Sequence, residues 1–113
     1  MSESSSHRRA KNQAAGKNGQ TEVPLPGGRR LDARTPTGRA IEIERGGTTV
    51  GLQAAARRLR DADASQRVLQ VPQQDMNAAA DAMRKVGVHG TVKNMAGTRR
   101  RSDLGLSDRN GVW

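Results

Sequence analysis

The chain has 113 residues, with 20 Lys and Arg against 11 Asp and Glu, a formal net charge of +9 and an isoelectric point near 11.5. Leu, Ile and Val make up only about 15% of the residues and Phe and Tyr are absent, which is typical of disorder over part of a chain. The length limits the chain to one small domain, and the lack of Cys excludes disulfides, thiolate metal sites and cysteine catalysis.

No apolar run is long enough to cross a bilayer, and the first residues contain no apolar segment of a secretory signal. We therefore expect no membrane partner and a cytoplasmic location, with delivery as an effector by a signal-less route left open.

The large apolar residues are concentrated in the middle of the chain. Residues 1–28 contain only Val23 and Leu25 and are predicted to form a flexible basic N-terminal arm. Residues 97–113 are predicted to be a second basic tail, at the C-terminal end. Residues 29–96 carry periodic apolar patterns, so a small α/β core is expected there.

The core is predicted to begin with a β-hairpin. Residues 29–35 and 39–45 alternate between polar and apolar side chains, as half-buried strands do. Between them, Pro36 and Gly38 occupy the second and fourth positions that a type I turn favours. The two strands are therefore expected to pair antiparallel across this turn.

The register of this hairpin is predicted from its apolar side chains. Pairing Ala33 with Ile41 places the apolar side chains of both strands on one sheet face and gathers Asp32, Glu42 and Glu44 on the other. Directly opposed residues have Cβ atoms about 4.5–5.5 Å apart, so Asp32 and Glu42 would repel each other unless a cation lay between them. An arginine of the chain and a divalent metal are both candidates for that cation.

Helices and strands alternate through the rest of the core. Apolar spacing predicts a helix over 49–62, a strand over 66–72, and a second helix that starts at Asp75 and ends before Gly87. A last strand is predicted over 88–93. The order β-β-α-β-α-β implies a mixed sheet with parallel crossovers and flanking helices. Because this core is thin, a homodimer or a larger protein partner is expected to stabilise it.

The excess of positive charge predicts contact with nucleic acid. Arg and Lys contacts to phosphate add affinity and salt dependence but carry no sequence information. No aromatic side chain lies in the predicted core, so base stacking is nearly excluded. The residues predicted to bind nucleic acid are Arg30, Arg57, Arg58, Arg60, Arg99, Arg100 and Arg101.

Asp32, a turn, and Glu42-Ile43-Glu44 on the next strand, followed by a helix, resemble the PD-(D/E)xK, or restriction-endonuclease-like, nuclease superfamily. The similarity covers about residues 29–96 and is greatest to small nuclease domains of bacterial toxins and of phages and mobile elements. The resemblance implies a restriction-endonuclease-like α/β fold and a nuclease that depends on Mg²⁺ or Mn²⁺, with DNA as the favoured substrate. It also implies that Asp32 and Glu42 bind the metal.

The chain departs from the superfamily pattern at several positions. Glu44 takes the place of the usual Lys, in an E-x-E form that some restriction enzymes share, and is assigned as a third metal ligand or as the general base on the attacking water. Gln53 begins a Q-x-x-x-R stretch that ends at Arg57 and is similar to a helical Gln motif, so it is assigned to positioning phosphate or water. Leu31 replaces the Pro before Asp32, and no upstream helix with an acidic metal ligand is predicted.

Two non-catalytic hypotheses stay open beside the nuclease. In the first, the chain is a nucleic-acid-binding or assembly module, and the acidic strand face is a ladder of Arg and Glu worth tenths of a kcal/mol. In the second, it is an accessory protein of a phage, mobile element or toxin system that folds on a larger partner. Metal-dependent cleavage that requires Asp32 and Glu42 would select the nuclease.

Overall fold

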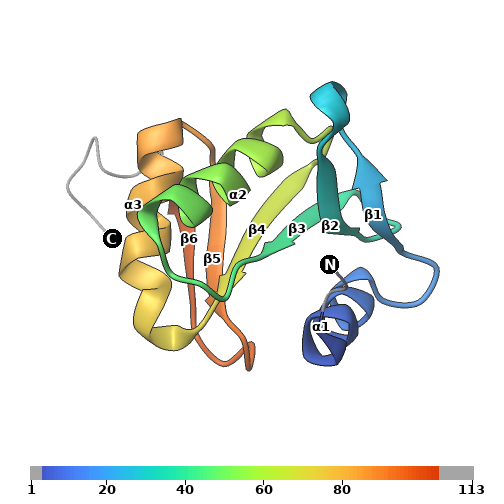
Figure 1. Ribbon diagram of the computed structural model, residues 1–113, viewed down its shortest axis with the longest axis horizontal. Coiled ribbons are helices and arrows are strands. Elements are labelled where there is room, and N and C mark those ends of the chain that lie inside the picture. Colours follow the sequence, from blue (N-terminus) through green and yellow to red (C-terminus); the bar gives the residue numbers. More distant parts are fainter. Residues whose placement is uncertain (1–3, 105–113) are drawn as a thin grey trace.

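The computed structural model describes residues 4–104, which form a six-stranded mixed sheet and three α-helices (Figure 1). The strands lie in the sheet in the order of the sequence. Neighbouring strands from β1 to β3 are antiparallel, β3, β4 and β5 are parallel, and β6 is antiparallel to β5. The elements are α1 (Ser5–Ala15), β1 (Gln20–Pro24), β2 (Arg30–Arg34), β3 (Arg39–Ile43), α2 (Thr49–Asp61), β4 (Gln66–Val71), α3 (Met76–Val86), β5 (Gly90–Asn94) and β6 (Arg100–Leu104), with short 3-10 turns at Pro26–Gly28 and Gln73–Asp75.

The predicted elements between residues 29 and 96 are all present, and the α/β class with a mixed sheet is confirmed. The Gly38 N–H donates to the Thr35 carbonyl at 3.0 Å, closing the predicted turn between β2 and β3. Helix α2 begins where the Thr48 hydroxyl accepts the Gly51 N–H, and α3 ends at Gly87, whose φ of 83° is the left-handed conformation that favours glycine. Local sequence signals therefore set these boundaries.

Two segments predicted to be flexible are instead folded within the described residues. The predicted N-terminal arm, residues 1–28, contains α1 and β1, and α1 begins where the Ser4 hydroxyl accepts the His7 N–H. The predicted tail, residues 97–113, contributes β6, which pairs with β5. Residues 105–113 lie outside the described part of the chain. The predictions of flexibility were wrong for these segments because short helices and edge strands need few large apolar residues.

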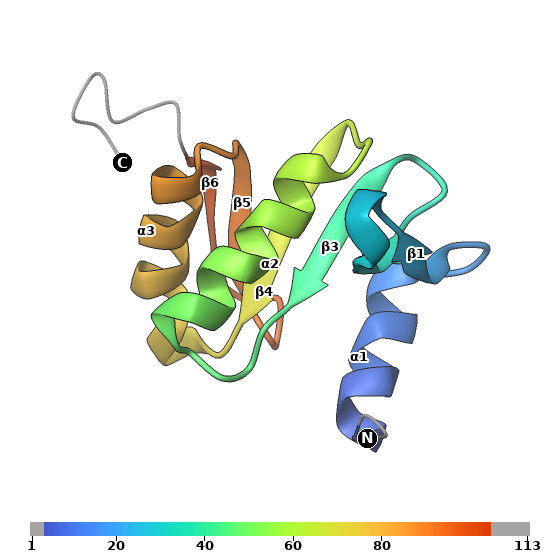
Figure 2. The ribbon, with the colours of Figure 1, turned by 45° about the horizontal axis from the view of Figure 1, so that its top comes forward.

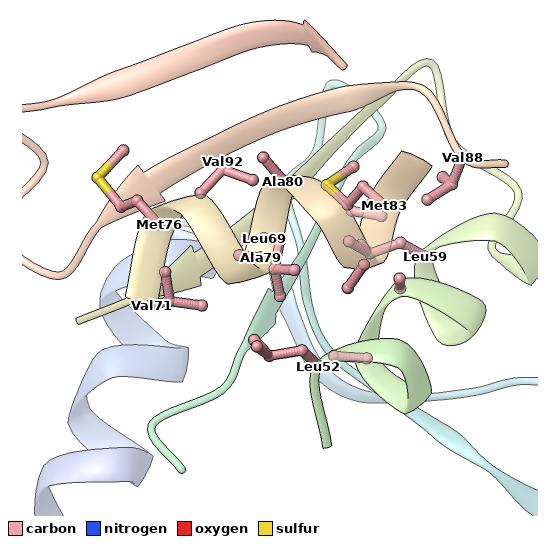
Figure 3. Packing of buried hydrophobic residues seen from close by; sticks show 14 of the residues in the cluster. Leu52, Leu59, Leu69, Val71, Met76, Ala79, Ala80, Met83, Val88 and Val92 are labelled. Carbon is pink, nitrogen blue, oxygen red and sulfur yellow. The ribbon is translucent and has the colours of Figure 1, made fainter. Parts of the chain in front are cut away.

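Helices pack on both faces of the sheet. Helices α2 and α3 cover one face with a cluster of Leu, Val, Ala and Met side chains, including Leu52, Leu59 and Met83 (Figure 3). Helix α1 lies on the other face and packs mainly against β1, β2 and β3 (Figure 2). The prediction that the hairpin buries its apolar side chains on one face was therefore wrong. Leu31 joins the α2 and α3 cluster, whereas Ile43 joins the α1 cluster on the other face.

Candidate functional site

The hairpin formed by β2 and β3 opens at Asp32 and Glu42. The predicted register is confirmed by the pair of Ala33 and Ile41, but the ladder includes only this pair and the next one toward the turn. Beyond Ala33, β2 continues to pair with β1, and β3 continues to pair with β4. Asp32 and Glu42 thus lie where the two strands separate.

Each carboxylate of this pair binds the backbone of the opposite strand. The Ile43 N–H, which a continued ladder would direct toward Leu31, donates to Asp32 Oδ2 at 2.8 Å. The Asp32 N–H donates to Glu42 Oε2 at 2.7 Å. One oxygen of each side chain is therefore fixed by an N–H donor, while Asp32 Oδ1 and Glu42 Oε1 remain for other partners.

Basic side chains from two helices meet the remaining oxygens. Arg58, on α2, donates from Nε to Glu42 Oε1 at 2.7 Å. His7, on α1, places Nε2 3.7 Å from Asp32 Oδ1. Lys11, one turn after His7, is only 3% exposed, and its Nζ donates to Glu22 Oε2 on β1 at 2.6 Å. The carboxylate pair is therefore enclosed by positive charge from α1 and α2.

Burial perturbs both carboxyl groups. Glu42 is fully buried, and the loss of hydration together with the neighbouring Asp32 charge raises its pKa to about 7, against the opposing effect of Arg58 and the Asp32 N–H. Desolvation also raises the pKa of Asp32, although the Ile43 N–H, His7 and Lys11 favour its ionised form. A neutral or shared-proton state of the pair is thus accessible near physiological pH.

The structure does not bring Glu44 to the carboxylate pair. The Glu44 Oε2 accepts the Gly46 N–H at 2.9 Å in the loop that follows β3, near the start of α2. Gln53 accepts a long hydrogen bond from Arg57, one turn further along α2, at 3.5 Å. Among residues 4–104, no group of three or more Asp, Glu or His side chains is placed to hold a metal ion. Of the three predicted metal ligands, Asp32 and Glu42 lie together and Glu44 lies apart.

The arginines predicted to bind nucleic acid are scattered over several surfaces. Arg58 is engaged with buried Glu42, and Arg60 pairs with Asp61 at 2.9 Å. Arg99, Arg100 and Arg101 line one hollow beside α3, where Arg101 donates to Asn77 at 2.8 Å, and Arg100 also lines the hollow that contains Lys93. The exposed side chains of Arg30 and Arg57 lie on β2 and α2.

The positions of His7 and Lys11 near the carboxylate pair were not predicted, because α1 has no stripe of apolar residues from which a helix could be recognised. The buried residues of α1 are Lys11 and Ala15, and neither gives a helical hydrophobic pattern. The capping residues could have predicted this helix, since Ser4 precedes it and Gly16 follows it.

No helix within residues 4–104 is both long and apolar enough to span a membrane. Comparison of the chain with protein-family models, curated proteins and solved structures gave no match. Function is therefore inferred from the geometry of the carboxylate pair and from the distribution of charge.

Proposed function

We propose that the chain is a divalent-metal-dependent nuclease in which Asp32 and Glu42 hold the metal. The observation that carries this proposal is the convergence of a fully buried and a half-buried carboxylate at the point where β2 and β3 separate. Each is oriented by an N–H of the opposite strand, with Asp32 Oδ1 facing His7 on α1 and Glu42 Oε1 facing Arg58 on α2.

The donor set fits a hard cation. Mg²⁺ binds through one or two carboxylates, keeps several waters and takes phosphate oxygens of its substrate. Asp32 and Glu42 suffice for such a site, and Glu44 is not required. A bound Mg²⁺ or Mn²⁺ would supply polarisation of the phosphoryl group and a water of lowered pKa.

The order of elements supports the same proposal. The chain runs from α1 through the antiparallel strands β1, β2 and β3 to α2 and the parallel strand β4. This order, with Asp32 on β2 and Glu42 on β3, is similar to the restriction-endonuclease-like arrangement. Helix α1 occupies the upstream place at which that superfamily carries a further site residue, and here it contributes His7 and Lys11.

The chain's own cations have a defined task in this proposal. Arg58 neutralises Glu42 in the free protein, and its guanidinium is the nearest donor for a phosphate oxygen brought to the pair. Lys11 is held by Glu22 with its charge close enough to Asp32 to favour that carboxylate's ionised form. The cations would thus keep the carboxylates ready to ligate and limit the repulsion between them.

One observation favours a second candidate, a non-catalytic nucleic-acid-binding module. The ion pair of Arg58 and Glu42 gives the buried carboxylate a partner at 2.7 Å, so the cluster is satisfied without any ligand. In that case the pair is a clamp that fixes the opening of the hairpin.

The test is cleavage of plasmid, single-stranded DNA and RNA in Mg²⁺, Mn²⁺ or EDTA, with Asp32→Asn, Glu42→Gln and the control Asp63→Asn, an exposed carboxylate on another loop. The proposal expects cleavage by the wild type and the control only in divalent metal, and none by the two site variants. Mn²⁺ binding, followed by the loss of the free-ion spin-resonance signal, gives a readout that is independent of activity. Binding of nucleic acid without cleavage in any metal would select the second candidate.

A further inference from the structure

One half of the sheet has a face that no described helix covers. Helix α1 spans β1, β2 and β3, and α2 and α3 lie on the opposite face (Figure 2). The open half is formed by β4, β5 and β6, with the start of β3 beside them. Most of its outward side chains are polar: Gln66, Thr91 and Ser102 line one hollow on it, and Val68 beside them packs into the α1 cluster. An exposed sheet face of this kind is available to a partner.

Five cations with no backbone or carboxylate partner among residues 4–104 surround this open face. Arg39, Lys93 and Arg100 line the hollow over β3 to β6, together with Arg67, whose guanidinium donates to the Leu59 and Ala62 carbonyls. Arg9 and Arg45 line a second hollow between α1 and the sheet, and Lys93 belongs to both hollows. We call these five residues the basic sheet face. Among the described residues, no Asp or Glu lines either hollow.

These cations also lack carboxylate partners in the described part of the chain. Arg29, Arg58, Arg60 and Arg84, elsewhere on the molecule, each pair with an Asp or Glu. On the basic sheet face, Arg39 instead donates to the neutral side chain of Gln66 at 3.0 Å. The positive charge there is therefore uncompensated, although acidic side chains are numerous elsewhere.

The cations repel one another. Lys93 lies directly across from Arg100 in the ladder of β5 and β6. Partial burial, together with the charges of Arg100 and Arg39, lowers the pKa of Lys93. A fold that gathers cations against their mutual repulsion gains free energy when an anion is bound between them.

The dimensions indicate a polyanion. From β3 to β6 the cations extend over three strand spacings, about 14 Å, which exceeds the size of a single phosphate. Residues 4–104 contain no Phe, Tyr or Trp, so none of the described side chains of this face offers bases such a ring to stack on. Its Arg, Lys, Gln, Thr and Ser side chains are donors for phosphate and sugar oxygens.

We infer that the basic sheet face binds the sugar–phosphate backbone of nucleic acid, independently of base sequence. This inference deepens the proposed function, because it names the surface that holds the substrate. Glu42 points to the α2 face of the sheet, opposite to Arg39, so the face anchors a stretch of backbone other than the one at the carboxylate pair. It therefore contributes to affinity, and the carboxylates contribute to cleavage.

The test separates binding at the basic sheet face from cleavage at the carboxylates by measuring nucleic-acid binding in EDTA. A fluorescent 20-nucleotide DNA or RNA is titrated with wild type, with Arg39→Gln/Lys93→Gln/Arg100→Gln, and with Lys17→Gln/Arg34→Gln/Lys85→Gln, which removes as much charge from other surfaces. The first variant should weaken binding by at least about tenfold and reduce the salt slope by about 2–3, because each phosphate contact contributes roughly one. The control should stay within about twofold of wild type.

Equal loss in both variants, or no loss in the first, overturns the inference, as does tighter binding to anionic phospholipid vesicles than to the oligonucleotide. A second readout does not require substitutions of the face. In reductively ¹³C-methylated protein, the oligonucleotide should shift the Lys93 signal and raise its pKa, while Lys85 stays unchanged; an unmoved Lys93 contradicts the inference. A protein that binds in EDTA but never cleaves retains the basic sheet face and loses only the nuclease proposal.

Discussion

The two charged regions of this sheet differ in how their charge is balanced. At the carboxylate pair, Glu42 is buried and Asp32 half-buried, and they are met by Arg58 and His7 from the covering helices. On the basic sheet face, Arg39, Lys93 and Arg100 share a hollow in which no described carboxylate takes part. The negative charge of the first region is balanced by basic side chains of the fold, whereas the positive charge of the second has no described acidic side chain to balance it. The net charge of +9 is therefore informative through its location.

The largest expected effect separates the two regions by kinetics. Glu42→Gln should lower kcat for cleavage by roughly a thousandfold, because metal polarisation of a phosphoryl group is worth several kcal/mol. Arg39→Gln/Lys93→Gln/Arg100→Gln should instead raise KM and leave kcat within about twofold. Steady-state assays in Mg²⁺ with both variants check this division. A lowered kcat in the triple variant would place both regions in one site.

The next effect concerns the balance of charge at the pair. Arg58→Met keeps the aliphatic contacts but leaves buried Glu42 without its cation, so the free energy of unfolding should fall by about 3 kcal/mol at pH 8. Urea denaturation measures the loss. Arg57→Met, on the exposed side of α2, serves as the control and should change stability by less than about 0.5 kcal/mol. Comparable losses in both would show that the ion pair contributes little.

A smaller effect follows from the titration of Glu42. Its pKa is raised from 4.5 to about 7 on folding, so the folded state holds a proton that the unfolded state releases. Stability contributed by this group is complete below pH 4.5 and is lost as the pH rises to 7, at up to about 1.4 kcal/mol per pH unit. Thermal unfolding from pH 5 to 8 without divalent metal should show this decline, and Glu42→Gln should flatten it. An unchanged slope in the variant would assign the titration to another group.

The smallest effect is local to the basic sheet face. Arg100→Gln removes one of the charges that lower the pKa of Lys93, so that pKa should move up toward its ordinary value. NMR titration of ¹³C-methylated lysines measures the shift, with Lys85 on α3 as the internal reference. An unmoved Lys93 would indicate that burial alone perturbs it.

The elements with regular apolar spacing were predictable from the sequence. The hairpin, α2, β4, α3 and β5 follow from alternation, helical spacing and turn residues. Strand β1 was missed because it ends in Pro24 and has Val23 as its only large apolar residue, although its burial alternates in the structure. Strand β6 was missed because its Arg-rich sequence resembles a tail, although its side chains alternate between the Lys93 hollow and α3.

The candidate site was predictable only as far as one hairpin reaches. The pairing of Ala33 with Ile41 places Asp32 beside Glu42, and this follows from local register. The meeting of Arg58 with Glu42 does not, because it depends on how α2 crosses the sheet. The basic sheet face depends on four strands and one helix, so its arginines and lysine are scattered through the sequence.

The sequential order of the strands has a consequence for how the chain folds. Strands that are consecutive in the sequence are neighbours in the sheet, and none is inserted between two earlier strands. The sheet can therefore grow from β1 to β6 with every pairing closing a loop no longer than one helix and its turns, which keeps contact order low for a mixed sheet. During synthesis, α1 and the first three strands would bring Asp32 and Glu42 together before β5 and β6 add Lys93 and Arg100 to the basic sheet face.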